Sequence, residues 1–184
     1  MTLDVARARA QTRGVSNVVH LNSAGSALMP IPVADALHEY LKDEEMSGGY
    51  ETAGARAHQL DRFYDATARL INCQPTEVAF IENATRAWDM AFYGFPLGPG
   101  DRVLTAPQEY GSNMIAYLHD ARRRGFTVDV VPPDAHGQID LEALESMIDD
   151  NVKLISISHI PTGGGVINPA ADVGKIAKRH GVAF

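Results

Sequence analysis

The sequence predicts an α/β fold with a mostly parallel sheet and helices on both of its faces. Short apolar, β-branched runs alternate with longer amphipathic stretches, and the connections between the runs are long enough to hold crossover helices. This alternation is typical of parallel sheets that are covered on both sides. The expected strands cover residues 78–82, 101–105, 126–131 and 152–158, the helices that follow them cover 86–93, 114–124, 140–149 and 170–179, and residues 182–184 indicate the opening of one more strand.

The N-terminal region is expected to be helical. Residues 1–18 predict a helical arm with weak amphipathicity. Pro30 and Pro32 then fix the start of a helix over residues 33–45, because proline is favoured at the first helical positions.

A flexible break divides the chain into two regions. The Ser-Gly-Gly-Tyr sequence at 47–50 predicts this break, and a second helix is expected over residues 52–72. We therefore divide the chain into an N-terminal helical segment, residues 1–50, and an α/β region, residues 51–184.

The composition argues against nucleic-acid and membrane partners. The chain has 184 residues, 45% hydrophobic content and a net charge of −7, which suits one globular α/β domain. No basic stripe is present, and the run Arg122 to Arg124 is expected on the solvated end of a helix. No segment reaches about 18 consecutive apolar residues, and no secretory signal is visible, so a cytoplasmic location is expected.

The cysteine and histidine pattern predicts no metal site. The single cysteine, Cys73, excludes an internal disulfide framework and is expected to be inert at the end of a helix. The histidines show no metal-ligand spacing.

The junction at residues 83–85 predicts an anion site. Ala84 is small enough for a close backbone approach, the Thr85 hydroxyl can donate to a phosphate oxygen, and the first amides of the next helix point at the same spot. The alternative is a plain helix cap with no ligand, because Asn83 and Thr85 are ordinary capping residues.

Two further loops follow strands and are expected at the same carboxyl edge of the sheet. In the loop at 108–113, the ring of Tyr110 could lie flat against a planar ligand, or it could simply be a packed loop tyrosine. In the loop at 159–165, three glycines allow a close backbone approach, and His159 and Thr162 offer hydrogen bonds. The glycine spacing matches neither a Walker loop nor a dinucleotide fingerprint.

Taken in order, these short motifs resemble the class V aminotransferase family. That family consists of fold-type I pyridoxal-phosphate enzymes, among them cysteine desulfurases, isopenicillin-N epimerase-like proteins and ergothioneine C–S lyases. The resemblance begins at about residue 18 and covers nearly all of the chain after it. The residues that carry it are His20 to Gly25 with Pro30, Glu82 to Thr85, Glu109 to Asn113, and Ser158 to Gly164 with Asn168 and Pro169.

The resemblance implies a role for individual residues. Ala84 and Thr85 resemble the pair that binds the cofactor phosphate. Tyr110 stands where cysteine desulfurases have a ring-stacking histidine, and Thr162 stands where they usually have an asparagine beside the 3-hydroxyl of the ring. These two departures favour the epimerase-like or ergothioneine-lyase branch. The loop that contains Asn22, Ala24 and Gly25 resembles the substrate-side loop.

The family's Schiff-base lysine and the aspartate that pairs with the pyridinium nitrogen have no counterpart in these residues, so the catalytic residues are unknown. Lys42, Lys153, Lys175 and Lys178 do not fit, and the last two are expected on a solvated helix face. The resemblance implies that residues 51–184 are a partial cofactor-binding large domain, cut before its last strands.

The expected function is the N-terminal part of a pyridoxal-phosphate-dependent enzyme with aminotransferase, C–S lyase or epimerase chemistry. The expected partners are an amino-acid substrate, the remainder of the polypeptide and a second copy in a homodimer. On its own the fragment is expected to be inactive. The alternative is a truncated, non-catalytic module that binds the cofactor or a phosphate, or that serves as a dimer partner.

Overall fold

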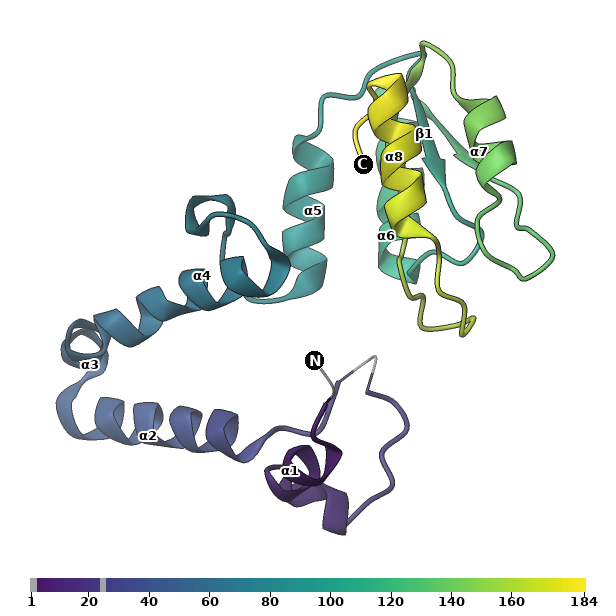
Figure 1. Cartoon of the computed structure of the whole chain (residues 1–184). Coiled ribbons are helices and arrows are strands. Elements are labelled where there is room, and N and C mark those ends of the chain that lie inside the picture. The colour runs from purple at the N-terminus through teal and green to yellow at the C-terminus, as the bar shows by residue number, and fades with distance from the viewer. Residues whose placement is uncertain (1–2, 24–25) are drawn as a thin grey trace. The chain divides into compact units, whose positions relative to one another are not determined.

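The computed structural model describes residues 3–23 and 26–184, and the chain divides into two compact units, residues 1–80 and 81–184 (Figure 1). The boundary between the units follows Phe80. The division at residue 50 separates a helical segment from a cofactor-binding region, and it stays a prediction. Among the described residues, no helix combines the length and the apolar character needed to span a membrane.

The second unit is built on a parallel three-stranded sheet with the order β2-β1-β3. Its strands are β1 (Arg102–Thr105), β2 (Thr127–Val130) and β3 (Val152–Ser156). Val103 lies between Val128 and Leu154 in the register of the sheet. Because β1 has a strand on each edge and helices on both faces, its last three residues are fully buried.

Helices cover both faces of the sheet, as the sequence predicts. On one face lie α5 (Ala84–Gly94) and α6 (Gly111–Arg124); on the other lie α7 (Leu141–Met147) and α8 (Ala170–His180). Burying a large apolar side chain contributes about 2 kcal/mol, so these two cores hold the unit together. The first core contains Phe92, Leu97, Val103, Ala116, Tyr117 and Phe126, and the second contains Leu104, Ile139, Leu144, Ile155, Val173 and Ile176 with their neighbours.

The helix ends follow local sequence signals. The α6 helix ends at Gly125, which takes the left-handed conformation at φ 83°, and the predicted C-cap there is confirmed. At the start of α7, the Asp140 carboxylate accepts the backbone N–H groups of Glu142 and Ala143 at 2.9 and 3.0 Å.

The first unit is helical. Its elements are α1 (Val5–Ala10), the 3-10 helix η1 (Arg13–Ser16), α2 (Ile31–Ser47), α3 (Gly49–Ala55), α4 (Ala57–Ile71) and the 3-10 turn η2 (Pro75–Glu77). The expected break at 47–50 is confined to Gly48, whose φ of 92° favours glycine.

The prediction of one continuous helix over residues 52–72 is wrong. The chain breaks between α3 and α4 at Arg56, which leaves the helical conformation at ψ 11°. The Arg56 guanidinium donates to the Asp43 carboxylate of α2, with Nε at 2.7 Å. The break thus places a charge-assisted clamp between neighbouring helices of this unit.

The predicted strand at 78–82 is also wrong. Among the described residues, no strand pairs with this segment, and Phe80 is exposed. An extended segment becomes a strand only when a neighbour satisfies its backbone groups. By contrast, Ala183 forms a parallel bridge with Leu154, which supports the expected strand opening at 182–184.

Candidate functional site

The order of the strands predicts a ligand-binding crevice between β1 and β3. The chain moves from β1 to β2 on one side and then crosses to β3 on the other side, so the direction of winding reverses between β1 and β3. In open parallel sheets, ligands bind at such a reversal, outside the carboxyl ends of the strands. Two loops flank this point: the β1–α6 loop, residues 106–110, and the β3–α8 loop, residues 157–169.

The start of α5 offers free amides for an anion. The Asn83 side chain caps the helix, because its Oδ1 accepts the Arg86 backbone N–H at 2.9 Å. The amides of Ala84 and Thr85 have no hydrogen-bond partner among the described residues, and both residues are exposed. A phosphate fits this end of the helix, since two amides and the helix dipole point at one open spot.

Aromatic contacts fix the direction of α5 against α6. Trp88 and Phe92 of α5 each meet the Tyr117 ring at 5.1 Å between centroids, and Tyr93 meets His119 at 6.3 Å. Because these contacts advance in the same direction along both helices, the two N-terminal ends lie at the same end of the unit. Figure 1 shows both helices beginning at the end where β1 terminates, and β3 runs parallel to β1.

Tyr110 presents its ring at that end. It is the N-cap residue of α6, and it is 52% exposed. Its backbone N–H donates to the Glu109 Oε1 at 2.7 Å, which fixes the backbone and leaves the ring open to a ligand. The geometry fits stacking on a planar ring, and that role stays a prediction.

The β3–α8 loop exposes Thr162 and the glycines, and hydrogen bonds of Asn168 hold the two ends of the loop together. Thr162 to Gly165 are exposed. Below them, buried Asn168 donates its backbone N–H to His159 O at 2.8 Å and its Nδ2 to Ser158 O at 2.7 Å. Its Oδ1 accepts the Ile139 N–H at 2.9 Å, so one asparagine closes the loop and ties it to the core.

Buried oxygens without partners gather at the end of β1. Among the described residues, six buried side-chain atoms lack a hydrogen-bond partner, and four of them belong to residues 105–112. Leaving such an atom unpaired costs about 1–3 kcal/mol, so this edge suits a ligand or segment that carries donors. The four atoms are Thr105 Oγ1, Gln108 Oε1, Glu109 Oε2 and Ser112 Oγ.

A buried phenol lies below this edge. Tyr117 of α6 is fully buried, and its hydroxyl donates to Ser156 Oγ at 2.8 Å. Burial raises the pKa of Tyr117 to about 12, while the bond to Ser156 acts in the opposite direction. The phenol therefore stays neutral near pH 7 and serves as a hydrogen-bond donor.

Sequence reasoning missed Tyr117 and Ser156 as parts of this edge. Glu109, Ser158 and Asn168 were named only as members of the motifs, with no role of their own. The available signal was weak: each is a polar residue beside a strand end or within an apolar helix stretch.

The predicted substrate-side residues lie in the first unit. The Asn22 carbonyl accepts the Ser26 N–H at 3.4 Å, and His20 Nε2 contacts the Ser26 carbonyl at 2.8 Å. Ala24 and Gly25 fall outside the described residues. The role of this loop stays a prediction.

The lysines of the second unit make surface contacts. Lys175 Nζ pairs with Asp172 at 2.7 Å, and Lys153 Nζ donates to the Asp150 carbonyl at 2.7 Å. Lys175 and Lys178 are exposed on α8, which confirms the solvated helix face expected for them.

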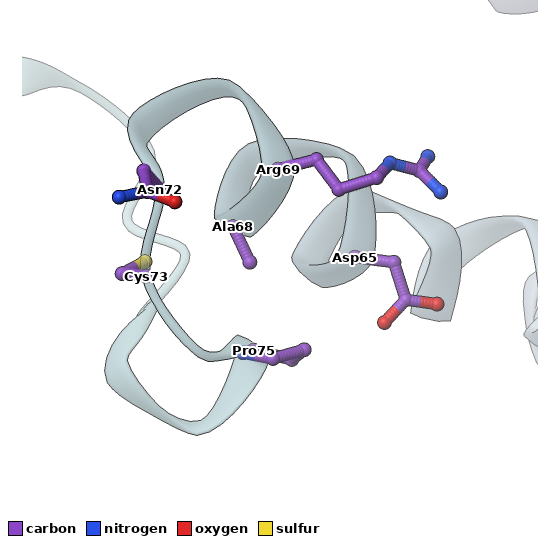
Figure 2. A pocket seen from close by; sticks show the side chains of 6 residues that line it. All are labelled: Asp65, Ala68, Arg69, Asn72, Cys73 and Pro75. Carbon is purple, nitrogen blue, oxygen red and sulfur yellow. The ribbon is translucent and has the colours of Figure 1, made fainter.

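A separate hollow of about 440 Å³ lies at the end of α4 (Figure 2). Asn72 turns the chain there in the left-handed conformation, at φ 59°, and Cys73 follows as a free, half-buried thiol. Ala68 points into the hollow, and Asp65 and Arg69 lie one turn apart at its rim. No residue predicted to bind the cofactor or substrate lines it.

Comparison with known proteins shows that the chain is similar to cysteine desulfurases. Over 173 residues it is 32% identical to a probable cysteine desulfurase of Halalkalibacterium halodurans, covering 90% of this chain and 43% of the relative. Among solved structures, the apo cysteine desulfurase from Thermococcus onnurineus matches with a TM-score of 0.86 at 23% identity, over 99% of this chain and 46% of that one.

A mutant of C-DES, with glycine covalently linked to its PLP cofactor, matches with a TM-score of 0.84 at 20% identity. It covers 94% of this chain and 46% of that one. These two solved structures share the fold of this chain. The chain thus spans less than half the length of the proteins it matches.

The motifs beside the expected crevice lie within the region that matches a known protein family. The family described as Aminotransferase class-V matches residues 19–184, which include the start of α5, the β1–α6 loop and the β3–α8 loop. The match covers most of the chain, and the fold comparison agrees with it. This chain belongs to the class-V aminotransferase family.

Proposed function

We propose that this chain is the N-terminal part of a pyridoxal-phosphate-dependent enzyme that acts on an amino-acid substrate. One observation carries the proposal: in a class-V aminotransferase, the start of α5, Tyr110 and the Thr162 loop lie at the same end of one unit. That end offers amides for a phosphate, an open ring for stacking, and unpaired buried oxygens for donors.

Each residue then has a binding task. The amides of Ala84 and Thr85 hold the phosphate of the cofactor, and the Thr85 hydroxyl adds a donor. Tyr110 stacks on the ring, and Thr162 hydrogen-bonds beside the ring hydroxyl. Asn22, Ala24 and Gly25 serve the substrate side.

Pyridoxal phosphate, when bound, supplies an electron sink for the carbon that bears the substrate amine. The residues of this chain bind and orient it. The buried Tyr117 and Ser156 would support the edge of the sheet at which the cofactor would bind, and they would move no proton, since the phenol remains neutral near pH 7.

The relatives support an amino-acid substrate but do not determine the type of reaction. The first relative is named a probable cysteine desulfurase, which supports chemistry on an amino acid. Tyr110 and Thr162 depart from the desulfurase pattern, and they favour C–S lysis or epimerisation in the related branches.

A second candidate is a non-catalytic module that holds the cofactor without a covalent bond. The lysines favour it: Lys153, Lys175 and Lys178 make surface contacts or are exposed, and none lies in the β1–α6 or β3–α8 loop. The two candidates differ in whether a lysine elsewhere in the intact protein bonds to the cofactor.

Titration of the intact protein with pyridoxal phosphate, followed by borohydride, separates the candidates. For the enzyme, we expect a visible absorbance band and a cofactor that stays on the protein after reduction and dialysis. For the module, we expect a band, but dialysis removes the cofactor even after borohydride. A spectrum identical to that of free pyridoxal phosphate under every condition contradicts both.

A matched pair of threonine variants tests the phosphate contact. Thr85→Val removes one donor, so the dissociation constant should rise about tenfold, the equivalent of one hydrogen bond to a charged group. Thr127→Val, at the exposed start of β2, should leave the constant unchanged. Equal constants for both variants would remove Thr85 from the site.

We also propose a cytoplasmic homodimer. Apolar side chains of α4 are exposed, including Leu60, Leu70 and Ile71, and an exposed apolar face of this kind suits a protein interface. Sedimentation of the intact protein at micromolar concentration should give the mass of a dimer; the mass of a monomer would refute this part of the proposal.

A further inference from the structure

We propose that Glu109 is a positioning residue that holds the β1–α6 loop and the β3–α8 loop in one arrangement. The inference rests on the proposed function, because these loops carry the two residues assigned to the cofactor ring, Tyr110 and Thr162. Glu109 itself touches neither residue assigned to the phosphate. It acts through the two loops.

A single oxygen of Glu109 accepts hydrogen bonds from both sides of the crevice. Its Oε1 accepts the Tyr110 backbone N–H at 2.7 Å and Asn113 Nδ2 at 3.1 Å, both from its own side. It also accepts the Ser158 hydroxyl at 2.5 Å, from the β3–α8 loop. This bond is the only side-chain hydrogen bond between the two loops among the described residues. One atom therefore fixes the backbone of Tyr110 and its spacing from the other loop.

Ser158 is held from its other side as well. The Asn168 Nδ2 donates to the Ser158 carbonyl at 2.7 Å, and Asn168 is 2% exposed. The serine thus stands between a carboxylate and a buried amide. Asn168 is itself fixed, because it is buried and its Oδ1 accepts the Ile139 N–H. The bond to Glu109 therefore constrains the whole β3–α8 loop, including the segment that carries Thr162.

The neighbouring Gln108 shows independently that the two loops touch. A Cβ at Gly164 would overlap Oε1 and Cδ of the Gln108 side chain. Gly164 has no left-handed φ, so a side chain here would meet the Gln108 side chain and would cause no backbone strain. Glu109 and Gln108 are adjacent in the chain, and both reach the opposite loop.

The burial of the carboxylate strengthens the constraint. Glu109 is half-buried, and its second oxygen, Oε2, lies buried without a hydrogen-bond partner among the described residues. Hydrogen bonds to a charged acceptor are stronger where water is excluded. Loss of the acceptor oxygen, Oε1, should therefore release both loops together.

Two substitutions separate the acceptor from the side-chain shape. Glu109→Gln keeps an acceptor oxygen of the same reach, whereas Glu109→Leu has similar size and no acceptor. Glu142→Leu serves as the control, because Glu142 is exposed on α7 and its side chain makes no hydrogen bond to any described residue. Ser158→Ala removes the same bond from the other loop, should the leucine variant not fold.

The first measurement is amide hydrogen exchange of the intact protein without cofactor. We expect faster exchange in residues 109–113 and also in residues 158–165 for Glu109→Leu or Ser158→Ala. Glu109→Gln and Glu142→Leu should exchange as the wild type does. Faster exchange restricted to residues 109–113 would overturn the proposal, since the second loop would then be independent of Glu109.

The second measurement is cofactor binding, followed by visible circular dichroism, which reports the orientation of the bound ring. Glu109→Leu should raise the dissociation constant about tenfold and change the dichroic band, while Glu109→Gln should restore both. A wild-type constant and band in Glu109→Leu would refute the positioning role while leaving the proposed function intact. A wild type that binds no cofactor would refute the proposed function, and hydrogen exchange alone would then decide the role of Glu109.

Discussion

The Tyr117 hydroxyl donates a 2.8 Å hydrogen bond to Ser156 Oγ, and this bond joins the middle of α6 to the last residue of β3. Tyr110 lies two turns before Tyr117 on the same helix, and Ser158 follows Ser156 by two residues. The bond therefore sets the position of α6 along the sheet. In doing so, it sets the level at which the β1–α6 loop ends and the β3–α8 loop begins.

The first prediction concerns Tyr117→Phe and its dependence on pH. Near pH 7 the variant should lose about 1 kcal/mol of unfolding free energy, because one buried hydrogen bond is gone. The pKa of Tyr117 is raised to about 12 in the folded chain, so its contribution is fully present below the ordinary value of about 10.

As the pH rises from about 10 to about 12, the phenol ionises in the unfolded chain first. The wild type should then lose about 2–3 kcal/mol relative to the phenylalanine variant. Urea denaturation at several pH values measures this difference. The contributions of the other tyrosines cancel, because both proteins contain them. A difference that stays constant up to pH 12 would contradict the raised pKa.

The second prediction concerns Gly164→Ala. The added methyl group would displace the Gln108 side chain, so we expect a loss of about 1 kcal/mol in unfolding free energy. In a Gln108→Ala background the same change should be almost neutral, because the obstacle is gone. Gly163→Ala is the matched control, since a Cβ there meets no atom within 4 Å. Equal losses in both backgrounds, from urea denaturation, would show that the two loops do not touch at this point.

The third prediction concerns the ring of Tyr110 in the intact protein. Tyr110→Phe keeps the ring, so cofactor affinity should stay almost the same and turnover should fall only modestly. Tyr110→Ala should weaken cofactor binding by about 1–3 kcal/mol, the magnitude of aromatic stacking on bases. Spectroscopic titration and steady-state kinetics measure both. If Tyr110→Phe abolishes turnover while Tyr110→Ala binds the cofactor normally, the hydroxyl is the reacting group and the stacking role is wrong.

The elements of the second unit were largely predictable from sequence because each carries its own local signal. Gly125 ends α6, Asp140 caps α7, and the β-branched run before Ser156 forms β3. The segment at 78–82 looked equally like a strand. It failed because pairing depends on a neighbouring strand, and pattern alone does not supply one.

The site was predictable as a set of loops but not as a network. Strand ends predict that Tyr110 and Thr162 lie at one edge of the sheet, whereas the strand expected before Ala84 does not form. The bonds that organise that edge join residues distant in sequence, such as Glu109 to Ser158 and Ile139 to Asn168. Such pairs have no local spacing, so they become visible only once the chain is folded.

The outer edge of β3 has a consequence for how this chain behaves in solution. Among the described residues, Ala183 alone pairs along it: the Ile155 N–H donates to the Ala183 carbonyl at 2.9 Å, and the Ala183 N–H donates to the Lys153 carbonyl at 3.3 Å. A strand edge with open backbone groups is a template for pairing with another extended segment. Produced alone and concentrated, the chain should therefore aggregate through this edge, and a strand supplied there would act as a solubilising cap.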